Sequence, residues 1–317
     1  MSRFVVGTGF ATLDRIYAST LAKPVEALGG SCANVLVSLA MFGHRVAPIL
    51  TLGADAIGTF LLNEMRRAGC VTKFVFRDPD EESAITVEHV DIQFARHSFS
   101  STCPETRRTL PSYTPLAESN ADRAKDAIRS AAVFYVDRLS PITLHAMELA
   151  SQAGALVLFE PNSVKDLVLF QRALALIDIL KVSEEVRSQI DAHELTAPPY
   201  FITTRGSHGL TLETPTDRIA LASLAAPRIV DTCGAGDMVT TGLIHVLMNA
   251  HASHGCVRVD DICSGLIMGQ KLAALNCAFI GARGLFHAFD GPTIRNALTA
   301  SSKRTLDVTG LGPYAGY

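Results

Sequence analysis

The chain has 317 residues, of which 48% are hydrophobic and 19% charged, and its formal net charge is −3 at pH 7. These values suit one large α/β domain or one domain with an appendage, and the lack of a basic stripe argues against nucleic acid as a partner. No leader peptide or apolar run of the ~20 residues that span a bilayer is visible, and the seven scattered cysteines include no CxxC pair, so we expect a cytoplasmic protein with reduced thiols and no membrane contact.

Strands and helices alternate along most of the chain. The strand segments are almost continuously apolar, which is typical of a parallel sheet covered by helices on both faces. Ligands of such sheets bind at the carboxyl ends of the strands. The loop 9–14 carries Asp14 and follows the first strand. The expected strands are 4–7, 46–52, 133–136, 156–159, 179–182, 201–203 and the end of one at 228–230, and the expected helices are 31–40, 56–68, 142–153, 164–176 and one that follows residue 236.

The stretch 83–115 breaks this alternation. It has no helical pattern, and its β-formers include Ile85, Val87 and Val90. We expect it to form a small β-structure outside the main sheet, together with residues 11–28. An active-site lid and an insertion without a function explain this stretch equally well. Because exposed strand edges tend to find partners, a homodimer through this structure is a further hypothesis.

The most informative motif is Asp231-Thr232-Cys233-Gly234-Ala235-Gly236-Asp237. It lies between a strand and a helix, so its glycine-rich turn opens the helix and presents free N–H groups that bind an anion. An acid held beside an anion suits a general base that works next to a phosphate. A glycine-capped turn whose acid merely favours the helix dipole is the simpler alternative.

Other segments occur in a telling order. Gly29-Gly30-Ser31-Cys32-Ala33-Asn34 opens the first helix, and Thr204-Arg205-Gly206-Ser207-His208-Gly209 follows a strand. With the motif at 231–237, these segments closely resemble the signatures of the ribokinase-like (PfkB) family of sugar and nucleoside kinases. The resemblance covers most of the chain and implies a three-layer α/β/α fold with a mostly parallel central sheet and a small β-sheet lid, in one kinase domain of residues 1–317.

The resemblance also implies roles for particular residues. Asp237 is the position of the family's catalytic base, and the turn of Gly234, Ala235 and Gly236 is its anion hole. A P-loop mechanism is excluded, because the chain has no GxxxxGK[ST] segment. The remaining implied positions are Asp14, Gly30, Ser31 and Asn34 for the substrate, and Ser183, Thr204, Gly206 and Gly209 for ATP.

Metal ions are implied as well. The family usually uses Mg²⁺, and many members respond to K⁺ near the positions of Asp231 and Cys233. The family often carries Asn-x-x-Glu where this chain has Ser183 and Val186, so the glutamate that organises magnesium-bound water is missing at its usual position. Glu185 is a candidate substitute, although an acid that favours the helix N-terminus explains it equally well. Likewise, the frequent Asp-Pro-Asn is replaced by a segment that begins with Glu160.

We therefore expect ATP-dependent phosphorylation of a hydroxyl group on a small sugar or sugar-like molecule. One alternative is a nucleoside kinase of the same family, which needs an apolar or aromatic slot for the base; the absence of Trp disfavours it. Another is a non-catalytic regulator that binds a sugar or a nucleotide, which the altered stretch 183–186 mildly favours.

Overall fold

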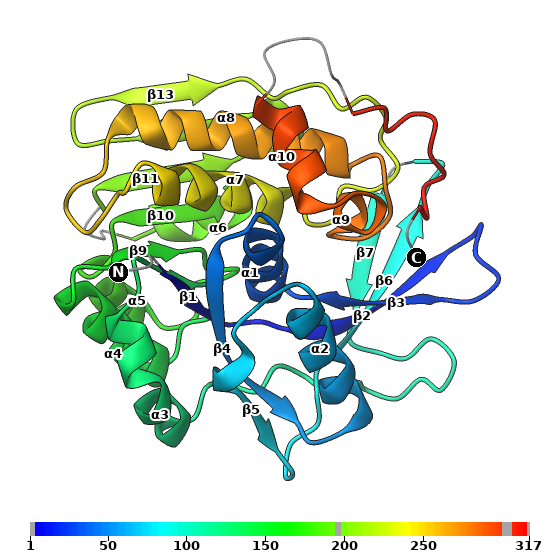
Figure 1. The fold of residues 1–317 in the computed structure, drawn as a ribbon, viewed down its shortest axis with the longest axis horizontal. Coiled ribbons are helices and arrows are strands. Elements are labelled where there is room, and N and C mark those ends of the chain that lie inside the picture. The colour runs from blue at the N-terminus through cyan, green and yellow to red at the C-terminus, as the bar shows by residue number, and fades with distance from the viewer. Residues whose placement is uncertain (1–3, 95, 194–197, 300–305, 316–317) are drawn as a thin grey trace.

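The computed structural model describes residues 4–94, 96–193, 198–299 and 306–315. They form two β-sheets and the helices that cover the larger one (Figure 1). In chain order, the strands of the larger sheet are β1 (Phe4–Thr8), β4 (Arg45–Gly53), β5 (Val75–Asp78), β8 (Val133–Val136), β9 (Leu156–Phe159), β10 (Ile179–Ser183), β11 (Tyr200–Thr204), β12 (Leu210–Glu213) and β13 (Arg218–Leu221).

The larger sheet has the strand order β13-β12-β11-β10-β9-β8-β1-β4-β5. From β5 to β11 every neighbouring pair is parallel, and β12 and β13 add an antiparallel edge. Parallel neighbours need crossover connections, which are mostly helices here. The carboxyl ends of the parallel strands share one edge of the sheet, and the loops that follow them are therefore brought together.

Helices cover both faces of this sheet. No helix among the described residues is long and apolar enough to cross a membrane. One face carries α1 (Ser31–Met41), α2 (Ala56–Arg67), α7 (Ala235–Asn249), α8 (Val259–Asn276), α9 (Gly284–Ala288) and α10 (Gly291–Thr299). The other face carries α3 (Glu118–Arg129), α4 (Pro141–Gln152), α5 (Leu167–Leu174) and α6 (Glu184–Asp191). Two short 3-10 helices are η1 (Thr72–Phe74) and η2 (Gly206–His208).

The strands are buried on both sides because their side chains alternate between two cores. In β1, Val5 packs into the core under α1 and α7, whereas Phe4 and Val6 pack into the core under α3 and α4. This alternation has a period of two residues, so an apolar run becomes a strand with two buried faces. The expected three-layer arrangement is confirmed.

A four-stranded sheet lies beside the carboxyl edge of the larger one (Figure 1). Its own small core contains Ile16, Val90 and, from outside the sheet, Val230 and Ile280, so apolar contacts fix it against the main body. Its strands are β2 (Thr12–Ala18), β3 (Val25–Gly29), β6 (Ile85–Asp91) and β7 (Arg96–Ser100), in the order β3-β2-β6-β7.

The structure corrects several local expectations. Asp14 lies in strand β2 and not in a loop. Residues 228–230 are not a strand; the Val230 N–H instead donates to the Cys277 carbonyl at 2.7 Å. Helix α5 starts at Leu167, later than expected, because the Asp166 side chain accepts from the Leu169 N–H at 2.9 Å and caps it. All seven cysteines are free.

Candidate active site

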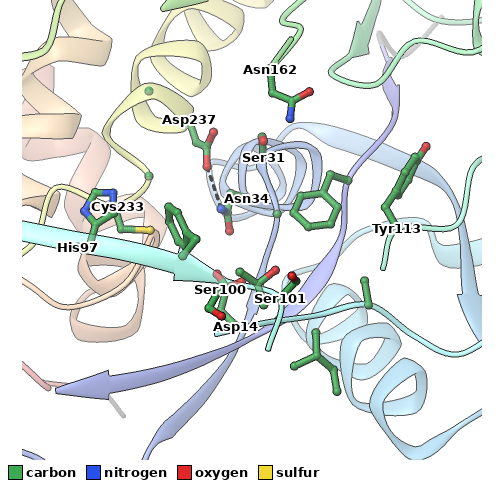
Figure 2. A pocket seen from close by; sticks show the side chains of 18 of the residues that line it. Asp14, Ser31, Asn34, His97, Ser100, Ser101, Tyr113, Asn162, Cys233 and Asp237 are labelled. Carbon is green, nitrogen blue, oxygen red and sulfur yellow. Dashed lines mark hydrogen bonds between the residues drawn. The ribbon is translucent and has the colours of Figure 1, made fainter. Parts of the chain in front are cut away.

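A cavity of about 650 Å³ lies between the small sheet and the carboxyl edge of the larger one (Figure 2). We call it the acceptor cavity. Its walls come from α1, from the first turn of α7, from β6 and β7 of the small sheet, and from the loop 111–113. The expected substrate residues Asp14, Gly30, Ser31 and Asn34 and the expected catalytic residues Gly234, Ala235, Gly236 and Asp237 all line it.

Asp237 is in the first turn of α7 and faces the acceptor cavity. The Asn34 amide of α1 donates to its Oδ2 at 2.8 Å, as the dashed line in Figure 2 marks. Desolvation raises the pKa of Asp237 to about 8, the Glu160 charge adds to the rise, and the Asn34 hydrogen bond and the Lys181 charge oppose it. A carboxyl group with such a pKa accepts a proton readily near neutral pH, as a general base must.

The turn before Asp237 is held in a conformation that only glycine adopts easily. Gly234 has φ 71°, and a Cβ there would lie 2.5 Å from the Ala282 carbonyl oxygen. The Ala235 N–H donates to the Thr232 carbonyl at 3.2 Å, so it already has a partner within the turn. The amides of Gly236 and Asp237 follow in the first helical turn, where N–H groups lack intrahelical partners. The turn and the α7 dipole therefore favour an anion at this point.

A buried ion pair lies directly under this turn. Lys181 in β10 is almost fully buried and contacts Glu160, and its Nζ donates to the Gly236 carbonyl at 3.2 Å. The hydroxyls of Tyr135 and Thr240 donate to the other Glu160 oxygen at 3.1 and 2.6 Å. Sequence reasoning missed this network, although a lysine inside an apolar strand was a signal that could have revealed it.

Asp14 points from β2 toward the α1 N-terminus. Burial raises its pKa to about 7; Arg283 opposes the rise and the Asp231 charge adds to it. A Cβ at Gly29 would lie 1.8 Å from the Asp14 carboxylate, which explains the first glycine of the Gly-Gly pair. The position of Asp14 suits a hydrogen-bond acceptor for substrate hydroxyls.

A second cavity of about 320 Å³, which we call the nucleotide cavity, lies on the other side of the α7 N-terminus. Three of the expected ATP residues, Thr204, Gly206 and Gly209, line it. Thr232, Ala235 and Gly236 line both cavities, so the glycine-rich turn forms the wall between them.

Two expected residues lie elsewhere. Ser183 lines neither cavity; it caps α6, where its Oγ accepts from the Val186 N–H at 3.3 Å. Glu185 is exposed in the first turn of the same helix and also lies outside both cavity walls. In both places the local helix-start explanation accounts for the residue.

Asp231 and Cys233, the expected cation residues, lie beside the small sheet. Burial alone would raise the pKa of Asp231, but hydrogen bonds from His97 and from the Cys233 and Gly281 N–H groups hold it below its ordinary value. Burial together with the Asp231 and Asp14 charges raises the pKa of Glu88, in β6, to about 9. Ligand atoms of Glu88, Asp231 and Cys233 lie within 4.8 Å of one another.

Comparison with known proteins places the chain. Residues 12–277 match the model of the pfkB family carbohydrate kinases. The chain belongs to this family. It is therefore a carbohydrate kinase, a phosphotransferase. It is 25% identical over 265 residues to a fructokinase of Vibrio alginolyticus, a match that covers 76% of this chain and 82% of the relative.

Solved structures share the fold of this pfkB-family kinase. The ribokinase of Giardia lamblia superposes with a TM-score of 0.77 at 15% identity, over 94% of this chain and 99% of that one. A double mutant of the fructokinase of Vibrio cholerae O395, solved with fructose, ADP and a potassium ion, gives 0.70 at 21% identity, over 89% and 94%. The predicted ribokinase-like fold is confirmed.

Sequence reasoning overlooked several cavity residues of this kinase. Arg138 lies over the Phe10 ring at 4.8 Å and pairs with Asp137, which accepts from the Phe10 and Cys32 N–H groups at 2.9 and 3.1 Å and so caps α1. Asp137 follows directly after an expected strand, which was an available signal. Phe99, in β7, and Tyr113, in the loop 111–113, carried no such signal, because only the tertiary fold brings these two segments to the cavity.

Proposed function

We propose that this kinase transfers the γ-phosphoryl group of ATP to a hydroxyl of a small sugar or sugar-like molecule, with Asp237 as general base and the turn of residues 234–236 as anion hole. In this proposal residues 1–317 are one kinase domain, and residues 11–28 and 83–115 form its lid. The observation that carries the proposal is the position of Asp237, with its raised pKa, at the turn that both cavities share.

The two cavities suit two different substrates. The acceptor cavity is rich in hydroxyl, amide and carboxyl groups, among them Asp14, Ser31 and Asn34, which pair well with a polyhydroxylated molecule. The nucleotide cavity has a mainly apolar wall, including Leu224 and Val239, which suits an adenine ring. With the sugar in one and ATP in the other, the γ-phosphate reaches the shared turn.

The proposed reaction follows from this arrangement. Asp237 takes the proton of the acceptor hydroxyl as that oxygen bonds to the γ-phosphorus and the bond from phosphorus to the ADP oxygen breaks. The α7 N-terminus stabilises the charge on the transferred group. Lys181 holds the Gly236 carbonyl and so keeps the turn in place. The positions of Asp14 and Asn34 orient the acceptor, so proximity supplies part of the rate.

The cavity walls also bear on Mg²⁺. Among the described residues that line the two cavities, Asp14 and Asp237 are the carboxylates, and they do not form a cage for a metal. This lining suits an ion that is held by the nucleotide phosphates and keeps several waters. Bound in that way, Mg²⁺ would supply charge neutralisation on the phosphates.

One observation favours a nucleoside as the acceptor. Phe10 and Tyr113 meet edge to face with ring centroids 6.1 Å apart, and Phe99, which is 56% exposed, lines the same cavity. These rings supply the aromatic slot that a base needs. A nucleoside kinase is therefore the second candidate function.

The test is an assay of ADP release with a panel of ketohexoses, aldopentoses, sugar acids and nucleosides, paired with thermal unfolding. A ligand at 100 times its Kd stabilises the folded state by about 2.7 kcal/mol. Asp237→Asn should lower kcat by about 10²–10⁴-fold and keep the thermal shift by the acceptor. Asp122→Asn, at an exposed position of α3, is the matched control. Near-wild-type turnover of Asp237→Asn would contradict the proposal, and binding without ADP release across the panel would favour a regulator.

A further inference from the structure

The side chain of Asn276 ends among backbone carbonyls next to the turn 231–236, which we call the catalytic turn because the proposed function places the reaction there. Asn276 is buried at the last position of α8. Its Nδ2 donates to the carbonyl oxygens of Cys233 at 3.5 Å, Gly281 at 3.3 Å and Ala282 at 3.2 Å. Its Oδ1 accepts from the Leu285 N–H at 3.0 Å. Because that N–H can only donate, the amide has one possible orientation, and its NH₂ group faces the carbonyls.

Without the amide, this place would suit a monovalent cation. Converging backbone carbonyls replace the hydration shell of K⁺ in proteins. The Asp231 carboxylate, which accepts from the Gly281 N–H at 2.8 Å, is attached to the same loop and adds a negative charge. The resemblance to the family implies K⁺ near Asp231 and Cys233. The three carbonyls of residues 233, 281 and 282 do not fit such an ion, since the Asn276 amide already donates to them.

These carbonyls matter because they belong to the two segments that meet at the anion hole. Gly234 packs directly on Ala282, with its missing Cβ 2.5 Å from the Ala282 carbonyl. The Asp231 N–H donates to the Cys277 carbonyl at 3.3 Å. Asn276 therefore joins the turn 231–236 to the segment 276–282 through one neutral donor.

We propose that the Asn276 carboxamide takes the place of the monovalent cation, so that the catalytic turn is braced from within the chain and phosphoryl transfer does not depend on K⁺. Asn276 is in this view a positioning residue: it touches no substrate, and it acts through Cys233 and Ala282 on Gly234. The activity readout of the inference rests on the proposed kinase function, whereas its structural readouts do not.

The first test uses the wild-type protein. Turnover and the melting temperature are compared in KCl and in tetramethylammonium chloride at equal ionic strength, and crystals soaked in RbCl are examined for anomalous scattering. We expect turnover to change less than twofold, the melting temperature to stay the same, and no rubidium peak beside Asn276. A rise in turnover of fivefold or more with K⁺ would overturn the inference. A rubidium peak at the carbonyls, or at the group of Glu88, Asp231 and Cys233, would also overturn it.

The second test opens the site. Asn276→Ala removes the donor, so the variant should lose at least tenfold in turnover without K⁺, regain most of it with K⁺, melt higher in KCl, and show a rubidium peak among the three carbonyls. Asn276→Asp keeps an acceptor for the Leu285 N–H but turns an oxygen toward the carbonyls, so it should require the cation even to reach its full melting temperature. Asn249→Ala is the control, because Asn249 contacts His245 at the far end of α7.

The outcomes separate the two hypotheses. Folded Asn276 variants that respond to neither K⁺ nor Rb⁺ would overturn the inference. If no acceptor is found and the kinase proposal fails, the melting temperatures and the rubidium peaks still decide the role of Asn276.

Discussion

Replacing Lys181 with Met tests the ion pair under the turn 234–236. The substitution keeps the length of the side chain but removes the charge that contacts Glu160 and the donor to the Gly236 carbonyl. Only 2% of the Lys181 side chain is exposed, and 15% of Glu160. The Glu160 carboxylate therefore stays largely buried and loses its counter-charge.

The expected cost follows from these contacts. Breaking a buried pair by removing one partner costs about 3–5 kcal/mol. We expect the lower end, about 3 kcal/mol, because the Tyr135 and Thr240 hydroxyls still donate to Glu160. The entropy of unfolding is about 2.1 cal/mol/K per residue. For 317 residues this is about 0.67 kcal/mol/K, so the melting temperature should fall by about 4–5 °C.

The pH dependence of kcat/KM should also change in Lys181→Met. The Lys181 charge lowers the pKa of Asp237, whereas the Glu160 charge raises it. In Lys181→Met the pKa of Asp237 therefore rises above its present value, and the acid limb of the kcat/KM profile moves to higher pH. The double variant Lys181→Met/Glu160→Gln loses both charges, so its stability should return toward that of the wild type. Because the Glu160 charge affects the pKa of Asp237 more than the Lys181 charge does, the acid limb of the double variant should move below that of the wild type.

Calorimetry measures the loss of stability, and the pH dependence of ADP release measures the shift of the acid limb. The control is Lys271→Met, at an exposed position of α8, whose free energy of unfolding should lie within about 0.5 kcal/mol of the wild type. The reasoning is refuted if Lys181→Met melts within 1 °C of the wild type, or if the double variant is as unstable as the single one.

The remaining predictions concern Asp237 and Gly29. As the proposed general base, Asp237 must be ionised, so kcat/KM should fall about tenfold per pH unit below pH 8. A flat profile from pH 6 to 8 would contradict this proposed role. The pKa of Asp237 is raised from 3.8 to about 8, so the folded state binds this proton more tightly than the unfolded state; the stability it contributes is complete below about pH 4 and is lost as the pH rises through 8. Asp237→Asn should therefore melt progressively higher than the wild type from pH 5 to about 8, and the difference should level off above pH 8. A constant difference in melting temperature from pH 5 to 8 would show that the shift is absent. Gly29→Ala places a Cβ 1.8 Å from the Asp14 carboxylate, so it should raise the acceptor KM about tenfold or more and leave the KM for ATP unchanged. Gly312→Ala, where nothing lies within 4 Å, is the control and should have no effect. An unchanged acceptor KM in Gly29→Ala would show that Asp14 does not bind the acceptor.

Residues in short local motifs could be predicted from the sequence, whereas residues that contact the turn from distant segments could not. The turn 234–236, Asp237 and the Gly-Gly pair were visible because each is a short segment whose conformation depends on its own glycines and on a helix start. The Lys181–Glu160 pair and the Asn276 amide were not. Each contacts the turn 231–236 from a distant segment: Lys181 reaches the Gly236 carbonyl across 55 residues, and Asn276 reaches the Cys233 carbonyl across 43.

Ser183 is a position where a local interaction competes with the implied role. The resemblance implies an ATP contact for Ser183, whereas its hydroxyl caps α6 in the structure, because a serine before a helix has an unpaired N–H within reach. Local hydrogen bonding of this kind competes with every functional interpretation of a residue at a strand end.

The alternation of apolar strands and helices determined the layered sheet from the sequence alone, because this alternation depends on periodicity within a few residues. The reaction type was implied by the resemblance of three glycine-rich segments to the signatures of the pfkB family. The tertiary structure alone decided which groups meet at the acceptor cavity: Asn34 with Asp237 across 203 residues, and the rings of Phe10, Phe99 and Tyr113 in its wall. Such meetings depend on how the sheets pack against each other, and no local pattern encodes that packing.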